Sequence, residues 1–205
     1  MKIGVIGAGN VGGRLGARWA KNGHEVMFAV RGEPSEPVRE VLSIAKTGSV
    51  AETAAKSDVI LLALPFDRVQ DAVASAGDLT GKIVIDAVNP VTPDLGGLST
   101  TAGTSAGEMI AQWAKGAKVV KAFNTVGFNI MENPSFPEGA PVMFYCGDDA
   151  EAKKKVAGLI SELGFDAADA GPLSQCRVLE PFALLWITLA YKAGYGRQIG
   201  FRFMR

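Results

Sequence analysis

Three glycines near the start of the chain, Gly7, Gly9 and Gly12, have the spacing G-x-G-x-x-G. This spacing suits the binding of a diphosphate. The first glycine allows a tight turn, the second lets the backbone approach the phosphates, and the third lets a helix pack close to a strand. A helix that begins there points its free amide groups at the same phosphates. The residues predicted to bind the diphosphate are Gly7, Ala8, Gly9, Asn10, Val11 and Gly12.

The elements around these glycines are those that a dinucleotide site requires. An apolar run of strand type ends at Ile6, and a helical pattern follows with Leu15 and Trp19 on one face. A second strand is expected at residues 25–30. A chain with 25 glycines in 205 residues produces chance matches to the spacing, so a glycine turn without a ligand is the alternative. Strand, glycine turn, helix and strand within about thirty residues favour the dinucleotide site of a Rossmann fold.

The residue that follows the second strand predicts which coenzyme binds. Enzymes that use NAD place Asp or Glu there, to bind the ribose hydroxyls. This chain has Val30 and then Arg31, so a guanidinium is available to bind a 2′-phosphate and no carboxylate repels it. Glu33 could turn back toward the ribose, and Arg31 could end the strand in solvent. We expect NADP rather than NAD.

Alternating strand and helix patterns continue to Asn124 and predict a doubly wound parallel sheet. Strands are expected at 48–50, 58–65, 82–88 and 118–124, and helices at 38–46, 51–56, 68–76 and 106–115, with Ser35 and Ser105 as helix caps. The run at 58–65 is continuously apolar, which is typical of a central parallel strand that is buried on both faces. A long loop is expected at 92–104.

Beyond Asn124 the pattern is less regular. Residues 129–141 are rich in Pro, Asn and Gly and are expected to form a surface excursion. A buried strand at 142–147, a helix at 150–163, a short strand at 165–170 and a final helix from Ser174 to about 193 follow. We expect one domain over residues 1–205, in which residues 126–205 extend the sheet and add a small α-lobe over its carboxyl edge.

The composition excludes several functions. Lys plus Arg equals Asp plus Glu at 21 each, so no net charge directs the chain to nucleic acid or to an anionic membrane. The only cysteines, Cys146 and Cys176, have neither a disulfide nor a metal-binding spacing, and we expect reduced core thiols and no metal site. The longest apolar run, 182–191, is about half of a bilayer span. With the first strand starting directly after Met1, we expect a cytoplasmic soluble protein.

In a doubly wound sheet the ligand binds outside the carboxyl ends of the strands. Beside the glycine turn, the residues expected at that edge are Leu64, Pro65, Asn89, Pro90, Ala122 and Asn124. Most of them are apolar or offer only backbone groups, which suits a flat nicotinamide ring against another flat ring. His24 lies in a turn at the opposite edge. Lys121 is expected to face solvent or pair with a helix rather than act as a catalytic acid.

This scarcity of acids and bases bears on the reaction. Reduction of a ketone or imine usually needs a positioned proton donor. Hydride transfer between two flat redox rings needs chiefly stacking at the right distance. The sequence therefore favours transfer from ring to ring and predicts no specific catalytic residue. Asn124, Thr125 or water could still supply a proton.

Motifs spread over the whole chain carry a resemblance to a known family. They are the glycine turn, Leu-Pro-Phe at 64–66, Val-Asn-Pro-Val at 88–91, Lys-Ala-Phe-Asn-Thr at 121–125, Cys-Gly-Asp-Asp at 146–149 and Asp-Ala-Gly-Pro-Leu-Ser at 169–174. With these the chain resembles the NADP reductases that exchange hydride with an 8-hydroxy-5-deazaflavin coenzyme. The Ala-Phe-Asn segment is also similar to the reductase domain of six-transmembrane metalloreductases, in which NADPH passes hydride to a flavin.

The resemblance implies a site as well as a reaction. Asn10, Val11 and Arg31 would contact the phosphates of NADP, and Leu64, Pro65 and the Asn89-Pro90 pair would flank the nicotinamide. Residues 126–205 would form the acceptor side. Two alternatives remain: an NADPH-dependent reductase of a small carbonyl or imine compound, and a non-enzymatic NADP-binding sensor.

The last predicted helix has a broad apolar face. Its members are Leu179, Phe182, Ala183, Trp186, Ile187 and Ala190. Ordinary core packing accounts for such a face, and we hypothesise that its excess surface also pairs two subunits into a homodimer.

Overall fold

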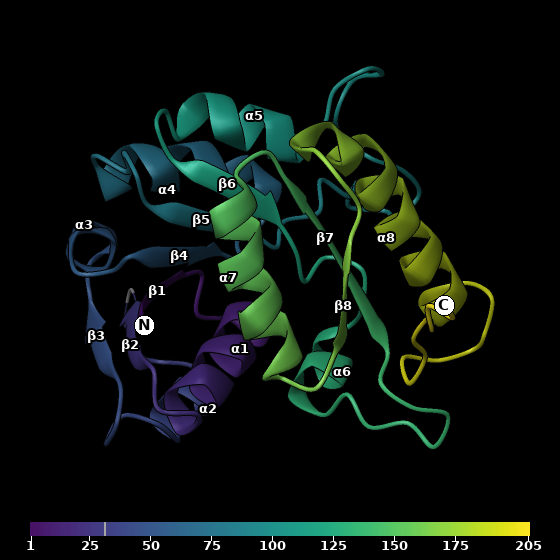
Figure 1. Ribbon diagram of the computed structural model, residues 1–205, viewed down its shortest axis with the longest axis horizontal. Coiled ribbons are helices and arrows are strands. Elements are labelled where there is room, and N and C mark those ends of the chain that lie inside the picture. Colours follow the sequence, from purple (N-terminus) through teal and green to yellow (C-terminus); the bar gives the residue numbers. More distant parts are fainter. Residues whose placement is uncertain (31) are drawn as a thin grey trace.

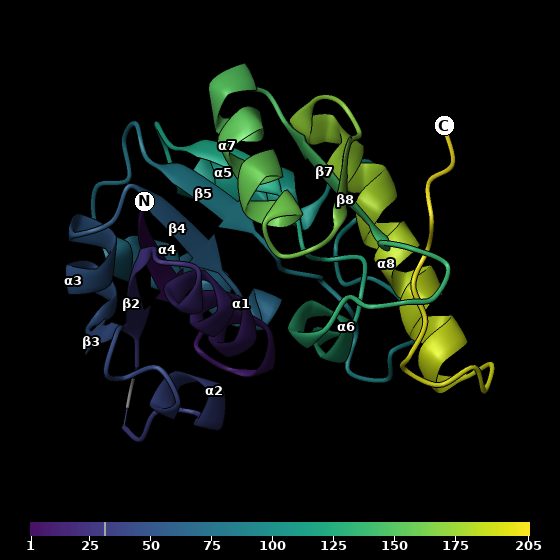
Figure 2. The ribbon, with the colours of Figure 1, turned by 60° about the horizontal axis from the view of Figure 1, so that its bottom comes forward.

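A computed structural model describes residues 1–30 and 32–205. Strands and helices alternate along the chain, and the strands form an eight-stranded sheet in the order β3-β2-β1-β4-β5-β6-β7-β8 (Figures 1 and 2). The strands are β1 (Lys2–Ile6), β2 (Glu25–Ala29), β3 (Lys46–Gly48), β4 (Val59–Leu62), β5 (Ile83–Asp86), β6 (Lys118–Lys121), β7 (Val142–Gly147) and β8 (Asp166–Asp169). The predicted doubly wound α/β fold is confirmed.

The helices cover both faces of this sheet. They are α1 (Asn10–Lys21), α2 (Glu36–Arg39), α3 (Val50–Ala55), α4 (Val69–Ala76), α5 (Ala106–Trp113), α6 (Phe128–Glu132), α7 (Ala150–Ser161) and α8 (Cys176–Tyr191), with short 3₁₀ turns η1 (Phe66–Arg68) and η2 (Leu173–Gln175). One core cluster joins the sheet to α1, α6 and α7, and a second joins its other face to α3, α4, α5 and α8. The sheet is therefore buried on both sides, as the continuously apolar β4 predicts.

The order of the strands reverses between β1 and β4. From β1 the sheet grows outward through β2 and β3 in one direction and through β4, β5 and β6 in the other, with all of these strands parallel. The carboxyl ends of β1 and β4 are thus the switch point where ligands bind in such sheets. The glycine turn lies directly at this point, because it follows β1.

The last two strands run against the other six. β7 pairs with β6 in antiparallel fashion, and β8 is parallel to β7. The connection between β6 and β7, residues 122–141, contains one short helix, the five-residue α6. At about 1.5 Å per residue, this helix is too short to carry the chain back across the sheet. The chain therefore turns and re-enters the sheet from its carboxyl edge, a reversal that the sequence pattern did not predict.

Other differences from the sequence predictions are local. The helix expected at 38–46 ends at Arg39, and Lys46 begins β3. Only Val38 and Val41 of this segment are buried, while Leu42 is 45% exposed, so no second apolar turn holds the helix on the core. The surface excursion expected at 129–141 contains α6, whose Ile130 and Met131 are buried.

One of the predicted caps also differs, and the last helix begins later than expected. Ser105 accepts a hydrogen bond from the backbone N–H of Glu108 and caps α5 as expected. Ser35 lies at the N-cap of α2, but its hydroxyl donates to the carbonyl of Ala8 at 2.6 Å and so ties α2 to the glycine turn. Ser174 lies in η2, and α8 begins only at Cys176. In the described part of the chain no helix is long and apolar enough to cross a membrane.

Candidate active site

The three glycines of the first turn have three different local environments. Gly7 has a φ of 101°, and a Cβ there would collide with the carbonyl of Ala63. A Cβ at Gly12 would collide with the carbonyl of Gly7, so α1 packs as close to the turn as the backbone allows. At Gly9, by contrast, a Cβ would meet nothing within 4 Å. The turn is thus tight at its two ends and open in the middle, where a diphosphate would approach the backbone.

The start of α1 is free to interact with an anion. Gly9 is its N-cap, no side chain of the described residues caps it, and its first turn contains no acid. The first amide groups of a helix have no partner within the helix, and they carry the positive end of its dipole. Two basic residues, Arg18 and Lys21, lie in its last turn, and Arg14, one turn after the start, hydrogen-bonds Asn10 and pairs with Glu132. This end of α1 can therefore hold a phosphate group of a ligand that lies over Gly9.

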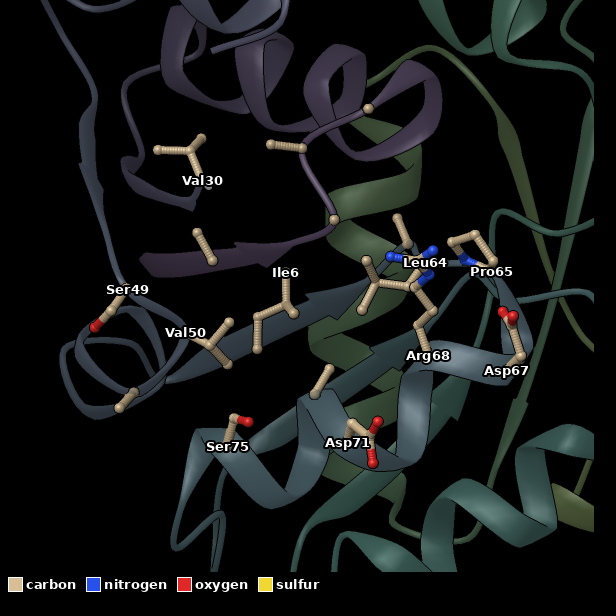
Figure 3. A pocket seen from close by; sticks show the side chains of 17 residues that line it. Ile6, Val30, Ser49, Val50, Leu64, Pro65, Asp67, Arg68, Asp71 and Ser75 are labelled. Carbon is tan, nitrogen blue, oxygen red and sulfur yellow. The ribbon is translucent and has the colours of Figure 1, made fainter. Parts of the chain in front are cut away.

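A cavity of about 900 Å³ opens beside the glycine turn (Figure 3). Its volume is within the range of about 300–1,000 Å³ that is usual for ligand pockets. It lies at the carboxyl ends of β1, β2 and β4. The residues that line it are Ile6, Gly7, Ala8, Gly9, Ala29, Val30, Ser49, Val50, Ala51, Ala63, Leu64, Pro65, Asp67, Arg68, Asp71, Ala72 and Ser75.

The walls of the cavity differ in character. Aliphatic side chains, among them Ile6, Val30 and Val50, offer flat apolar surface that suits a purine ring. The polar groups lie mostly at α4, where Arg68 is the one cation among the lining residues that the structure describes. The sequence pattern predicts a helix at 68–76 and gives Arg68 no role. The signal that could have found it is its place directly after Pro-Phe-Asp at 65–67, in the turn that follows β4.

The predicted site residues fall into four sets. Gly7, Ala8, Gly9, Leu64 and Pro65 line the cavity. Asn10, Val11 and Gly12 form the first turn of α1 beside it. Arg31, on which the preference for NADP was based, lies outside the described residues. The other four, at the ends of β5 and β6, lie outside the cavity: Asn89, Pro90, Ala122 and Asn124.

Asn89 and Asn124 are joined to each other at the ends of β5 and β6. The side-chain amide of Asn89 donates to the carbonyl of Asn124 at 2.7 Å, and that of Asn124 donates to Asn89 Oδ1 and to the carbonyl of Leu179, both at 3.2 Å. Phe123, between the buried Ala122 and Asn124, has a φ of 62°, which is strained for a bulky residue. The strained turn directs Asn124 toward Asn89, and Leu179 brings α8 to the same place.

Lys121 is fully buried beneath this pair. Its ammonium lies 2.7 Å from Asp86 Oδ2 and 2.9 Å from Glu180 Oε1, and it donates to the carbonyl of Val88 at 2.8 Å. Burial alone would lower the pKa of Lys121, but the two carboxylates outweigh it and raise the pKa above its usual range. Lys121 is therefore a permanent cation enclosed by protein, and it pairs with a helix, as one of the sequence interpretations expected.

Glu180 also binds backbone groups of a third element. Its two carboxylate oxygens accept hydrogen bonds from the N–H groups of Ala106 and Gly107, each at 3.0 Å, at the start of α5. The pKa of Asp86 is raised by burial, which the charge of Lys121 opposes. The network thus joins β5, β6, α5 and α8 under the carboxyl edge of the sheet.

The two cysteines lie next to this network. Cys146 and Cys176 are free and buried, with their sulfur atoms 3.6 Å apart. The hydrogen bond between the thiols and their burial raise the pKa of Cys176 above its usual range. The prediction of reduced core thiols agrees with this geometry. No group of three or more His, Cys, Asp or Glu side chains that could hold a metal ion occurs among the described residues.

Comparisons with known proteins agree with this geometry. Residues 2–90 match the model of a family described as "NADP oxidoreductase coenzyme F420-dependent". A solved structure from Arthrobacter sp. FB24, described as a candidate F420-dependent NADP reductase, is 31% identical, covers 100% of both chains and has a TM-score of 0.90. The chain belongs to this family of F420-dependent NADP oxidoreductases.

The chain is also similar to two further proteins. The F420-dependent NADP reductase of Methanocaldococcus jannaschii is 29% identical over 97% of this chain and 98% of its own length. The metalloreductase STEAP3 of Rattus norvegicus is 27% identical over 89% of this chain, which spans only 36% of that longer protein. Both resemblances that the sequence motifs indicated are therefore found over most of the chain.

Proposed function

We propose that this protein transfers a hydride between NADPH and an acceptor of the deazaflavin or flavin type. The observation that carries the proposal is the open backbone at Gly9, between the uncapped start of α1 and the 900 Å³ cavity. This arrangement fits a dinucleotide whose diphosphate crosses the switch point of the sheet. The names of the relatives from M. jannaschii and Arthrobacter support a deazaflavin as the acceptor.

The residues of this chain would act mainly by binding and orientation. The glycine turn and the amides of α1 hold the diphosphate, and the aliphatic wall around Val30 and Val50 holds the adenosine. The other half of the coenzyme then extends toward Asn89 and Asn124 at the ends of β5 and β6, with Pro90 beside it. NADPH, when bound, supplies the hydride, so the protein must chiefly hold two flat rings at the right distance.

Specificity for NADP over NAD is part of the proposal. It is supported by the absence of an acid at the end of β2, where Val30 and Arg31 stand. Replacing Arg31 with Met should weaken binding of NADPH more than binding of NADH. Equal affinity of the wild-type protein for the two coenzymes would contradict this part.

The last third of the chain would provide the acceptor side of the same domain. Leu179 of α8 contacts Asn124 through its carbonyl group, and α8 lies beside β7 and β8 in both views (Figures 1 and 2). An acceptor that stacks on the nicotinamide near Asn124 would therefore lie next to residues 126–205. We propose one domain for residues 1–205, located in the cytoplasm.

A homodimer through α8 is also part of the proposal. Four residues of the predicted apolar face, Leu179, Ala183, Trp186 and Ala190, are buried within the subunit. The apolar side chains of α8 that remain exposed are those of Val178 (59%), Leu185 (47%) and Tyr191 (53%). Sedimentation at micromolar concentration should give a dimer, and Leu185→Glu should give a monomer. A wild-type monomer would contradict the proposal.

The decisive experiment combines binding with turnover. NADPH and NADH are titrated by fluorescence, and NADPH oxidation is then followed with a deazaflavin, flavins, quinones, ketones and imines. We expect turnover with the deazaflavin or with flavins. Turnover only with carbonyl or imine compounds would instead assign a small-molecule reductase, and tight binding without turnover would assign a sensor. If neither coenzyme binds, the proposed function is wrong.

A further inference from the structure

Arg68 has no role in the site that the sequence predicted. It is the last residue of η1, between β4 and α4, and its side chain lines the cavity beside the glycine turn. Asp67 and Asp71 line the same wall, so one cation stands between two acids. Among the described residues neither acid forms an ion pair with Arg68.

The side chain of Arg68 extends toward the glycine turn. Figure 3 shows it leaving the start of α4 in the direction of Leu64, on the cavity side. Leu64 lies close to the glycine turn, since a Cβ at Gly7 would be 3.0 Å from the Cδ2 atom of Leu64. An extended guanidinium without a carboxylate partner, in a cavity that takes an anionic ligand, is positioned to bind a phosphate.

The order of the strands indicates which phosphate this is. The 2′-phosphate of NADP is bound at the end of the second strand of such folds, which here is β2. Arg68 follows β4, and β1 separates β2 from β4 in the sheet. The diphosphate crosses the switch point between β1 and β4, which is where Arg68 lies.

We propose that Arg68 binds the diphosphate of the coenzyme from the side of β4, facing the amide end of α1 across the ligand. This rests on the proposed function, because it requires a dinucleotide in the cavity. The guanidinium adds a full positive charge opposite the diphosphate, to which the glycine turn and the start of α1 offer backbone N–H groups. Arg68 thereby sets affinity for NADPH and NADH alike, and it leaves the choice between them to the end of β2.

The test compares Arg68→Met and Arg68→Lys with two control variants. Gln70→Met changes an exposed residue of α4 that does not line the cavity, and Lys154→Met removes one positive charge from the exposed side of α7. NADPH and NADH are each titrated by fluorescence at low and high salt. Thermal unfolding of each free protein shows whether it is folded.

Arg68→Met should raise the Kd of NADPH and of NADH by the same factor, about tenfold for the loss of one charge-assisted contact. Arg68→Lys should recover part of this loss, and both controls should bind as the wild type does. The salt dependence of binding should become weaker in Arg68→Met.

Three results would overturn the proposal. An unchanged Kd would mean that Arg68 does not contact the coenzyme. A loss confined to NADPH would place it at the 2′-phosphate, and an equal loss in Lys154→Met would reduce the effect to overall charge. Wild-type protein that binds neither coenzyme would refute the proposed function and this inference together, whereas wild-type binding with an unchanged variant refutes the inference alone.

Discussion

Lys121 and Asp86 face each other across β6 and β5, with the ammonium 2.7 Å from a carboxylate oxygen and both side chains fully buried. Glu180 of α8 supplies the second carboxylate, at 2.9 Å. Removing two charges from water is costly, and only their mutual attraction and further hydrogen bonds offset that cost. The backbone of Val88 and of α5 supplies those bonds. The cluster therefore stabilises the fold only while it is complete.

Loss of the cation should be strongly destabilising. Lys121→Met leaves two buried carboxylates without their cation, and we expect the free energy of unfolding to fall by about 3–5 kcal/mol in urea denaturation. Lys118→Met, in the same strand but with its side chain 42% exposed, should leave the midpoint of urea denaturation almost unchanged. Adding Asp86→Asn to Lys121→Met should recover part of the loss. Equal midpoints for the two lysine variants would contradict the assigned role.

Substitutions at two glycines of the turn should have different effects, one on coenzyme affinity and the other on stability. Gly9→Ala adds a methyl group where the protein has no neighbour, so unfolding should be unchanged while the Kd of NADPH rises by about tenfold or more. Gly7→Ala combines an unfavourable φ with a collision against Ala63 and should lower stability by about 1–3 kcal/mol. Thermal unfolding and NADPH titration of both variants check this, and a Gly9→Ala protein with normal affinity would count against the site.

A pH-dependent contribution is expected from Glu108. Its carboxylate accepts two hydrogen bonds from Arg177, at 2.8 and 2.7 Å, and this pairing lowers its pKa from the ordinary value of 4.5. The folded pKa is below the unfolded one, so the contribution is present above pH 4.5 and is lost as the pH falls through the folded-state pKa. Glu108→Gln should therefore lower the Tm at pH 7 and much less near pH 3.

The exposed Glu138, for which no partner is found among the described residues, provides the matched control for this measurement. Glu138→Gln should change the Tm little at either pH. If Glu108→Gln lowers the Tm equally at both pH values, packing and not the charge of Glu108 holds α5 on α8.

The thiols of Cys146 and Cys176 should be inert in the folded protein. Both are buried, and the raised pKa of Cys176 suppresses the thiolate that reacts. A thiol reagent such as Ellman's reagent should label neither cysteine in buffer and both in denaturant. Rapid labelling of one thiol in buffer would contradict this expectation and would show that the first turn of α8 detaches from β7.

The sequence predicts those parts of the candidate site that rest on local chemistry. Gly7 and Gly12 leave no room for a Cβ, and Gly9 keeps the backbone open to a ligand, so their spacing predicts geometry directly. The apolar runs of β1, β4 and β5 likewise predict strands that are buried on both faces. Local patterns of this kind carry most of the fold from residue 1 to Asn124.

The remaining features depend on contacts between distant segments. The reversed direction of β7 follows from the shortness of α6, which the Pro-, Asn- and Gly-rich composition of 129–141 concealed. From the sequence, Lys121 is an ordinary strand residue, because its partner Glu180 is far along the chain and only the fold brings the two together. From the sequence, Arg68 is the first residue of a predicted helix. The position of β4 next to β1 in the sheet is what brings Arg68 to the cavity.

The position of Glu180 has a consequence for dividing the chain. The family model matches residues 2–90, which suggests a separable nucleotide-binding half, yet α8 supplies one of the two carboxylates that pair with Lys121 and the acceptor for the first amide groups of α5. A fragment that ends before α8 would leave Lys121 with Asp86 as its one carboxylate partner, and the first amide groups of α5 without the carboxylate that they bind. During synthesis, the region of β5, β6 and α5 should therefore reach its full stability only after α8 has left the ribosome.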